Sequence, residues 1–433
     1  MKVSANKRLF RVWRVFAVAL VLFVIAVVVV STRAHAAGWA GKVATVDGVK
    51  TVTNPATGFA PAATVKLPEL WRVGGDTDNE DELFGVISSI RIDTNGDVYL
   101  LDSQLSEVKV YSKDGEFLRT IGHEGEGPGE FRRPSAMFFT DDGKVAVVQL
   151  MPGKIVLLSK DGKPAGDFPI PQPADGGFQL VQGADARGGN IVLLMGRQKF
   201  DQTTKKWSRD SFLASVTPEG KQTAEYCTKE NVIDMAAPVL DDAQWDTFER
   251  RWAVGPDGKV YACKSYDDYA ITVYDKTGKV DMVITKDSKH LPRTAREKDI
   301  MTKAMTFYSK MIPNCKTNIH DMAKDIDFFY LRDDGSMWVM PASGARNMAK
   351  GTLGTFDVFN PQGQFVKNVT LQGQGKPLDD LYVFEKDRFY VVTSFLTAAM
   401  SAQGVEGIDT AGENAEPMSV ICYKLEGDNI AAK

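Results

Sequence analysis

The amino-acid sequence predicts an all-β fold, a six-bladed β-propeller that follows one hydrophobic N-terminal helix. Three observations predict it: an internal repeat, a regular series of hairpin turns, and an unassigned strand upstream of the first repeat. Residues 74–101 and 121–148 follow the same pattern, in which Phe84 or Phe131 precedes the turn glycine by 12 residues. The two copies are offset by 47 residues, a period that is typical of solenoids and propellers.

Turn dipeptides divide the rest of the chain into four-stranded units. Asn-Gly and Asp-Gly pairs between apolar runs favour type I′ hairpins, in which both central residues need a positive φ. The candidate first turns are Asn95-Gly96, Asp142-Gly143, Gly188-Gly189, Asp257-Gly258, Asp334-Gly335 and Lys386-Asp387. The candidate second turns are Asp114-Gly115, Asp161-Gly162, Glu219-Gly220, Thr277-Gly278 and Gln362-Gly363. The sixth unit therefore lacks its second hairpin.

The strand missing from the sixth unit is expected from the other end of the chain. The run ATVKLPELWRV (63–73) lies upstream of unit one and belongs to no unit. We expect it to complete the sixth blade, because this closes the ring and leaves no exposed sheet edge. The propeller is then expected over residues 63–428, after a lead-in segment at 37–62.

The stretch GHEGEGPGEF (122–131) is predicted to be a crossover between blades. A phosphate-binding loop would join its backbone amides to a lysine. Here no Gly-Lys-Ser/Thr follows, and Glu124, Glu126 and Glu130 would repel a phosphate. Strand-like sequence follows instead, so we expect Phe131 to anchor the next inner strand.

This pattern resembles the NHL-type and related exported bacterial six-bladed propellers. The match is best over DVYLLDSQLSEVKVYSKDGEFLRTIGHEGEGPGEFRRP (97–134), and residues 39–55 resemble the lead-in of exported bacterial members. The resemblance covers roughly residues 40–430 in architecture but only 70–170 in clear motif. It implies a fold and no activity, because NHL-type motifs specify no chemistry.

The first 36 residues predict a signal peptide or an N-terminal transmembrane anchor. Basic side chains precede 16 apolar residues, Val15–Val30, a length between a signal-peptide core and a full span of about 20 residues. As an anchor, residues 12–31 would contact the lipid bilayer. The N-terminus would then be cytoplasmic and the propeller would lie on the periplasmic side of the bacterial cytoplasmic membrane. Cleavage after Ala36 would instead release a periplasmic or secreted protein.

The exported part is acidic. Residues 1–36 hold six of the 52 Lys and Arg residues and none of the 56 Asp and Glu residues, so the remainder has a formal charge of −10. Such a charge disfavours nucleic-acid binding, and a basic partner is compatible with it. No nucleic-acid partner is expected.

Four cysteines lie in the exported part: Cys227, Cys263, Cys315 and Cys422. An oxidising compartment permits two disulfides in three pairings. Buried free thiols are equally compatible with Cys263 and Cys422, which fall within strand-like runs.

A polar ring is predicted around the central channel. The positions eight residues before each first turn are expected on the inner strands at one depth, and they are Ser88, Ser135, Val181, Arg250, Asp327 and Asp379. The polar members of this set, all except the valine, could bind a cation or a small ligand. Alternatively, the arginine pairs with the acids and the channel holds water.

Metal chemistry has little support in the sequence. Beyond the leader the histidines are only His123, His290 and His320, which are widely separated. The segment Asp93–Asp97 mimics part of a calcium loop but lacks the distal Glu of an EF-hand, and a hairpin turn explains it. No nucleophile motif such as GxSxG appears. We expect no cofactor, and calcium is the one alternative left open.

A helical insertion is expected at about 289–315. Thr294 and Glu297 form a capping box for a helix over 295–312. Its face carries Met301, Met305, Tyr308 and Met311, and methionine-rich faces suit adaptable contacts. This face either packs on the propeller or docks a partner. A long mobile loop is expected at about 398–417.

These observations favour a non-enzymatic, membrane-anchored binding subunit on the periplasmic face of a larger membrane complex, such as a respiratory or photosynthetic one. A soluble periplasmic propeller that binds a small ligand, glycan or peptide is the first alternative. A calcium-dependent hydrolase or lyase is the second, so the question of enzymatic activity stays open.

Overall fold

The computed structural model describes residues 38–171, 178–405, 407 and 417–425. The chain divides into two compact units, residues 1–40 and 41–433, and the fold below is that of the second. The hydrophobic segment expected at 12–31 lies outside the described residues. In the described ranges, no helix is long and apolar enough to cross a membrane.

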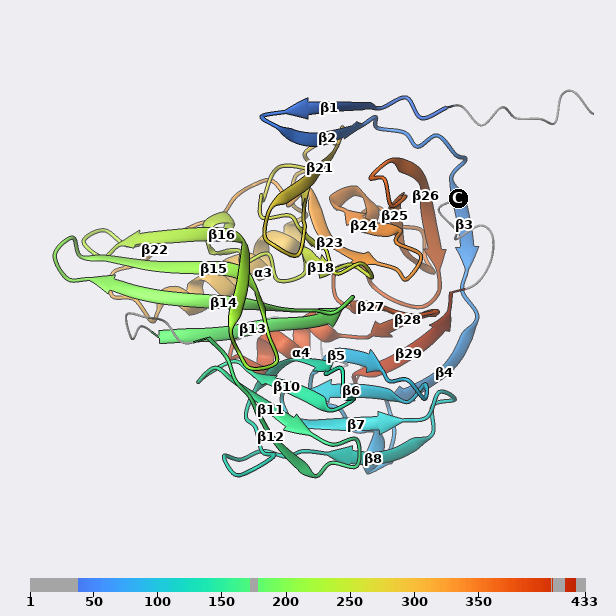
Figure 1. The fold of residues 1–433 in the computed structure, drawn as a ribbon, viewed down its shortest axis with the longest axis vertical. Coiled ribbons are helices and arrows are strands. Elements are labelled where there is room, and N and C mark those ends of the chain that lie inside the picture. The colour runs from blue at the N-terminus through green and yellow to red at the C-terminus, as the bar shows by residue number, and fades with distance from the viewer. Residues whose placement is uncertain (1–37, 172–177, 406, 408–416, 426–433) are drawn as a thin grey trace, which may run out of the picture. The chain divides into compact units, whose positions relative to one another are not determined.

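Six β-sheets form the six blades of the propeller (Figure 1). Blade one is β5(Ile87–Ile92), β6(Val98–Asp102), β7(Glu107–Tyr111) and β8(Phe117–Ile121). Blade two is β9(Pro134–Phe139), β10(Val145–Gln149), β11(Lys154–Leu158) and β12(Pro164–Phe168). Blade three is β13(Phe178–Arg187), β14(Asn190–Asp201), β15(Lys206–Val216) and β16(Gln222–Asp234).

Blades four to six each pair with a strand from residues 42–74. Blade four is β18(Trp252–Val254), β19(Val260–Ala262), β20(Ala270–Tyr274) and β21(Val280–Lys286). Blade five is β23(Ile326–Leu331), β24(Met337–Pro341), β25(Thr352–Phe359) and β26(Phe365–Gln372). Blade six begins with β27(Leu381–Glu385), β28(Arg388–Val392) and β29(Ser419–Lys424). The lead-in forms a hairpin, β1(Lys42–Val46) and β2(Val49–Asn54), and β2 adds parallel to β21.

The ring closes as expected, although the closing run is two strands rather than one. β4(Glu69–Gly74) pairs antiparallel with β29 and completes blade six. β3(Ala63–Lys66) pairs parallel with β26 of blade five instead. Pro68 separates the two strands, because proline offers no N–H to a ladder, and the chain passes there from one blade to the next.

Most of the hairpin turns differ from the expected type I′ geometry. In the first, the N–H of Gly96 donates to Asp93 O and the N–H of Asp93 donates to Asp97 O. Gly96 has a φ of +93°, whereas Asn95 is not among the residues with positive φ. This is a type I turn followed by a glycine bulge, so only one residue needs a positive φ. In the turn at Gly188-Gly189, by contrast, both central residues have a positive φ.

Helices and a small two-stranded sheet lie outside the six blades. α3(Ala295–Ser309) begins at Thr294 with the expected capping box to Glu297. α2(Asp242–Trp245) precedes blade four, and β17(Val239–Asp241) pairs with β22(Lys316–Asn318). The single-turn helices η1(Glu80–Glu82) and η2(Ala342–Ala345) lie in loops.

The expectation of an irregular loop from residue 398 is wrong for its first part. α4(Phe395–Ala402) is helical there, because its alanine, leucine and methionine residues are strong helix formers. Residues 406 and 408–416 of the expected loop lie outside the described residues.

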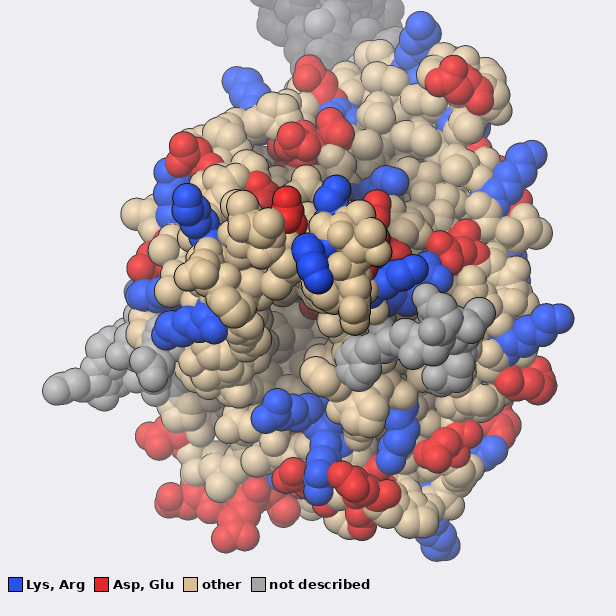
Figure 2. All heavy atoms as spheres, turned by 90° about the vertical axis from the view of Figure 1, so that its left-hand side faces the viewer, with Lys and Arg blue, Asp and Glu red and all other residues tan. Residues whose placement is uncertain are grey.

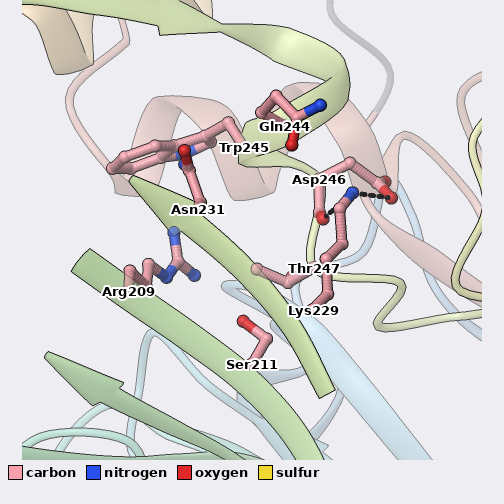
Figure 3. Close-up of a pocket in the computed structure, with 8 residues that line it drawn as sticks. All are labelled: Arg209, Ser211, Lys229, Asn231, Gln244, Trp245, Asp246 and Thr247. Carbon is pink, nitrogen blue, oxygen red and sulfur yellow. Dashed lines mark hydrogen bonds and ion pairs between the residues drawn. The ribbon is translucent and has the colours of Figure 1, made fainter. Parts of the chain in front are cut away.

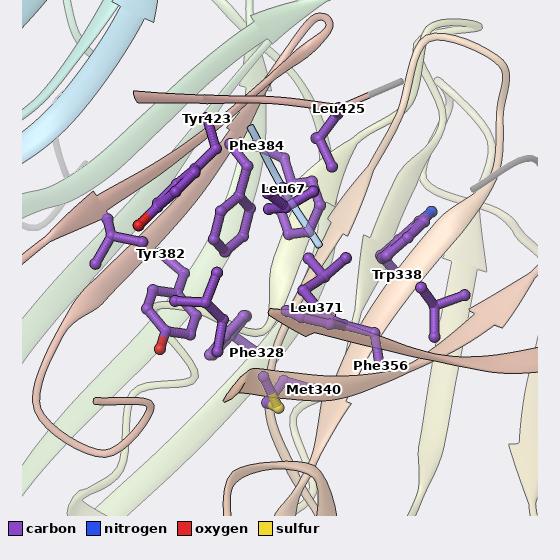
Figure 4. Close-up of a cluster of buried hydrophobic side chains, with 14 of the residues drawn as sticks. Leu67, Phe328, Trp338, Met340, Phe356, Leu371, Tyr382, Phe384, Tyr423 and Leu425 are labelled. Carbon is purple, nitrogen blue, oxygen red and sulfur yellow. The ribbon is translucent and has the colours of Figure 1, made fainter. Parts of the chain in front are cut away.

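The core consists of apolar clusters between neighbouring blades, and the largest lies between blades five and six (Figure 4). Phe131 of the crossover is completely buried in the cluster between blades one and two. A Cβ on Gly122 would lie 2.4 Å from the Phe131 ring, so the crossover needs glycine there. All four cysteines are free thiols, and three of them are buried.

Replacing Phe131 with alanine should destabilise the propeller by about 3–5 kcal/mol, because the change opens a cavity between two blades. Denaturant unfolding of purified protein measures this. The control is Leu118→Ala, at a side chain that is 43% exposed, which should change the free energy of unfolding by no more than about 0.5 kcal/mol. Equal losses in both variants would contradict the anchoring role of Phe131.

Candidate functional site

The inner strands of four blades carry a β-bulge at the same position. The ladders skip one residue between Ile87 and Ser89 of β5 and between Ile326 and Phe328 of β23. They also skip one residue at equivalent places in β9 and β13. The residues left without a ladder partner are Ser88, Ser135, Gln182 and Asp327. Each lies on the inner edge of its sheet, which faces the axis of the ring, and bulges of this kind re-aim side chains next to functional sites.

Three of the predicted ring positions are therefore bulge residues, namely Ser88, Ser135 and Asp327. In blade three the bulge falls on Gln182, one residue after the predicted Val181. The polarity of Gln182 is the signal that could have placed it correctly, since the other bulge residues are polar too.

The two remaining predicted positions precede their inner strands. Arg250 comes two residues before β18, and its guanidinium lies 4.3 Å over the Phe328 ring. Asp379 comes two residues before β27. Its carboxylate forms an ion pair with Arg296 of α3 at 3.0 Å. The structure therefore brings Arg250 close to the ring and gives Asp379 a separate partner.

The ring contains buried polar atoms that no described residue satisfies. Ser88 Oγ, Gln182 Oε1 and Arg250 Nη2 are buried without a hydrogen-bond partner among the described residues. Ser135 Oγ donates to Val181 O at 3.3 Å. Buried polar groups are almost always hydrogen-bonded in folded proteins, so these atoms require water or a polar ligand.

The acid of the ring is held by cations. Asp327 lies 4.0 Å from Arg346 Nη1, and burial raises the pKa of its carboxyl group. Arg346 also pairs with Glu297 on α3. Through Glu297 and the neighbouring Arg296, the first turn of α3 is fixed to blades five and six beside the ring.

A second set of charges lies toward the opposite ends of the inner strands. Arg91 Nη1 is 3.2 Å from Glu385 Oε1, and Arg91 Nη2 is 3.8 Å from Asp185. Burial raises the pKa of Glu385 to about 7, and the nearby Arg91 only partly opposes this. Blades one, three and six thus share one ion-pair network.

Figure 2 shows the face on which the blade three extension and α3 lie. A hollow lies near its middle, and Lys and Arg side chains surround it. A partner or ligand approaching this hollow therefore meets a locally basic surface on a chain that is acidic overall.

The methionine-bearing face of α3 packs largely on the chain itself. Met305 is buried with Ile233, and Met301 and Tyr308 pack against the same cluster. Met311 is 66% exposed. Docking of a partner at these four residues stays a prediction, and only Met311 offers a large exposed area.

The residues of the suggested calcium loop do not fit a calcium ion. Asp93 Oδ1 accepts from the N–H groups of Asn95 and Asp97, and Asp93 Oδ2 pairs with Lys160 at 2.8 Å. The carboxylate is therefore occupied by the turn and by a cation.

Folding brings two of the distant histidines to aspartates. His320 Nδ1 is 2.6 Å from Asp242 Oδ1, and Asp241 lies close enough for the three to form a potential metal-binding group. However, Arg293 pairs with the buried Asp242 at 2.5 Å, and a metal cation would compete with this guanidinium. His290 pairs with the buried Asp325 at 2.9 Å, and this raises the pKa of the imidazole.

Comparisons with known proteins agree with the fold. A family model described as a 6-bladed beta-propeller (DUF5128) matches residues 77–168, which contain blades one and two. No curated protein matches the chain. The NHL-type resemblance stays a prediction.

Similar solved structures include a member of the DUF4221 family from Bacteroides vulgatus (12% identity, TM-score 0.47, covering 83% of this chain and 97% of that one). They also include virginiamycin B lyase from Staphylococcus aureus (10%, 0.41, 82% and 99%). A third is the calcium-binding protein regucalcin from Agrobacterium tumefaciens (10%, 0.42, 84% and 97%). At such identities and TM-scores these likenesses carry no argument about function.

Glu385→Gln should remove a pH-dependent part of the stability. Because the pKa of Glu385 is raised from 4.5 to about 7 in the folded protein, the native state binds this proton more tightly than the unfolded state does. The stabilisation that protonated Glu385 gives the folded state is therefore fully present below about pH 4.5 and is lost as the pH rises through about 7.

The free energy of unfolding of wild type relative to the variant should fall by roughly 1–3 kcal/mol between pH 4.5 and pH 8. Denaturant unfolding at a series of pH values measures this. Glu69→Gln, at an exposed ion pair with Arg72, should show no such trend. A difference between wild type and Glu385→Gln that does not vary with pH would refute the raised pKa.

Proposed function

We propose that this protein is an exported, non-enzymatic binding propeller that recognises a polar ligand or partner group at the ring of bulge residues. The single observation that carries this is the buried polar atoms left unsatisfied at two of the equivalent bulges, Ser88 and Gln182, and at Arg250 close to them. Ser88 and Gln182 lie on the inner strands of blades one and three, and Arg250 directly precedes the inner strand of blade four.

The chemistry around the ring favours binding over catalysis. The acid of the ring, Asp327, is held by Arg346, and Arg250 provides positive charge rather than a base. Of the described histidines, His290 and His320 pair with aspartates outside the ring. His123 pairs with Glu130 in the crossover. An activated nucleophile would need a base within hydrogen-bond reach.

We propose further that the propeller acts on the periplasmic side of the cytoplasmic membrane as a subunit of a membrane complex. The support for this part is the sequence of the N-terminal segment, in which basic residues precede the apolar run 15–30. The acidic exported part and the basic surroundings of the hollow suit charged partners in that compartment.

Intact mass of the protein extracted from native membranes in mild detergent tests the anchor. We expect a chain that begins at residue 1 or 2 and migrates within a larger complex. A soluble monomer that begins at residue 37 would contradict the anchored subunit and would favour the released, ligand-binding form.

Native mass spectrometry of the purified protein tests the ring. We expect a small polar adduct on the wild type, a smaller adduct fraction for Ser88→Ala, which removes one hydroxyl group, and none for Arg250→Met. The matched control is Arg72→Met, because Arg72 pairs with Glu69 at the surface, and the adduct should persist in it. An adduct that survives Arg250→Met would show that it binds outside the ring, and a wild type with no adduct would show that the ring holds only water.

A further inference from the structure

Blade three is longer than the other blades and forms an arm on one face of the propeller (Figure 1). In an antiparallel blade, the loop between the second and third strands lies at the same end as the connections between blades. The β14–β15 hairpin therefore projects from the face that also carries the crossovers before blades one and two. The β17–β22 sheet and the end of α3 pack beside this hairpin and β16. We refer to residues 197–208, 229–241 and 308–318 as the arm.

The arm has a small hydrophobic core of its own. Ile233 and Met305 are buried in it. Trp245 of α2 stacks on Trp207, with the ring centroids 6.0 Å apart. Figure 3 shows Trp245 at the side of β15 and β16, near Arg209, whose guanidinium lies 4.8 Å over its ring. This packing holds the arm in one position, so its outer surface is pre-organised for docking.

The arm exposes apolar side chains beside unpaired lysines. Its large exposed apolar residues, at 44% to 66% exposure, are Phe200, Val232, Val239 and Met311. The exposed lysines that form no ion pair with a carboxylate of the described residues are Lys199, Lys205, Lys206, Lys310 and Lys316. In the ladder Lys199 is opposite Ser208, which is opposite Val232. Directly opposite residues share a face of the sheet, so charge and apolar surface occur together there.

The crossover before blade one carries the opposite charge. Its exposed acids form no ion pair within the described chain, and they are Asp76, Asp78, Glu80 and Asp81. In the same crossover Leu83 is 49% exposed, and Leu105 in the neighbouring loop is 44% exposed. The N–H of Ser103 donates to Val86 O and joins this loop to the crossover. We refer to residues 75–86 and 103–106 as the recess.

The recess and the arm have different heights on the same face. Blades one and two end well short of the tip of the arm (Figure 1). Figure 2 shows Asp and Glu side chains gathered at the lower end of this face, where blades one and two lie. The face therefore combines a basic protrusion with an acidic depression.

The hairpin turns of the opposite face lack this combination. None of the large exposed apolar side chains of the described residues lies in these turns. Several of their charges pair locally, as Lys144 does with Asp142 and Lys163 with Asp161. The exposed apolar surface and the unpaired charges are thus features of the arm and the recess.

We propose that two copies of this protein form a dimer in which the arm of each copy occupies the recess of the other. A two-fold axis in the plane of the interface exchanges any two patches on one face, so both contacts form at once and the assembly is closed. The unpaired lysines of the arm then meet the unpaired acids of the recess. The apolar side chains beside them, such as Met311 and Leu83, are covered in the same contacts.

Light scattering of the purified full chain in mild detergent, with the detergent mass subtracted, measures the oligomeric state. We expect twice the chain mass of 47.5 kDa for the wild type. Lys310→Glu combined with Lys316→Glu reverses charge on the arm and should weaken dimerisation at least tenfold. Asp76→Lys combined with Asp78→Lys reverses charge on the recess and should weaken it to a similar degree. Higher ionic strength should weaken the wild-type dimer, because salt screens exposed charges.

Mixing the two charge-reversed proteins is the decisive step. In the mixture each reversed arm meets a normal counterpart of opposite charge only in the other variant, so a heterodimer should form. All four substitutions in one chain should likewise restore a homodimer. The matched control is Lys113→Glu combined with Lys221→Glu, at exposed lysines in turns of the opposite face, which should leave the dimer unchanged.

Thermal unfolding checks that every variant is folded, and exposed charge reversals should change it little. Arg250→Met, which alters the ring, should dimerise normally, so dimerisation and ligand binding at the ring can fail separately.

Three results would overturn the proposal. The first is a wild type that is monomeric, or that forms an assembly larger than a dimer. The second is a dimer that persists in both charge-reversed variants. The third is a failure of the mixed variants and of the fourfold variant to dimerise, because it would show that the arm and the recess do not meet each other.

Discussion

The pairing of β4 with β29 is the constraint on which the rest of this propeller depends. A blade with only three strands would expose a sheet edge and leave one side of its neighbours uncovered. By completing blade six with a strand from the start of the domain, the chain joins its two ends through main-chain hydrogen bonds. β3 likewise pairs with blade five, and β2 of the β1–β2 hairpin pairs with blade four. Three blades therefore form main-chain hydrogen bonds with residues 42–74.

Closure also determines what the centre of the ring can do. The free edges of the inner strands face one another around the axis, where their main-chain groups have no further strand to pair with. Bulges at equivalent positions in four of these strands place a polar residue at that edge. The repeat thus produces a ring of similar backbone features, while the residue at each bulge, Ser, Ser, Gln or Asp, gives it a particular chemistry.

The distribution of paired and unpaired cations separates structural from candidate binding sites. Arg91 and Arg346 each link different blades or loops through carboxylates, and their role in holding the fold accounts for them. Arg250 instead lies over the Phe328 ring, and within the described residues it forms no ion pair with a carboxylate. A charge that the fold does not compensate is destabilising by itself, so its presence points to a partner from outside the chain.

The sequence by itself determined the architecture of this protein. Glycines at fixed spacing, alternating apolar runs and a strand without a unit defined six blades and their closure, because such turn and strand signals depend on neighbours a few residues apart. The capping box at Thr294 was predictable for the same reason. Three ring positions, Ser88, Ser135 and Asp327, followed from the repeat spacing alone.

Only the tertiary structure decided the rest, because it depends on contacts between residues far apart in the chain. The bulge that selects Gln182 over Val181 arises from pairing with β14, and the division of residues 63–73 between two blades arises from Pro68 at a blade boundary. Pairing of Asp379 with Arg296, and of His320 with Asp242, could not be derived from spacing.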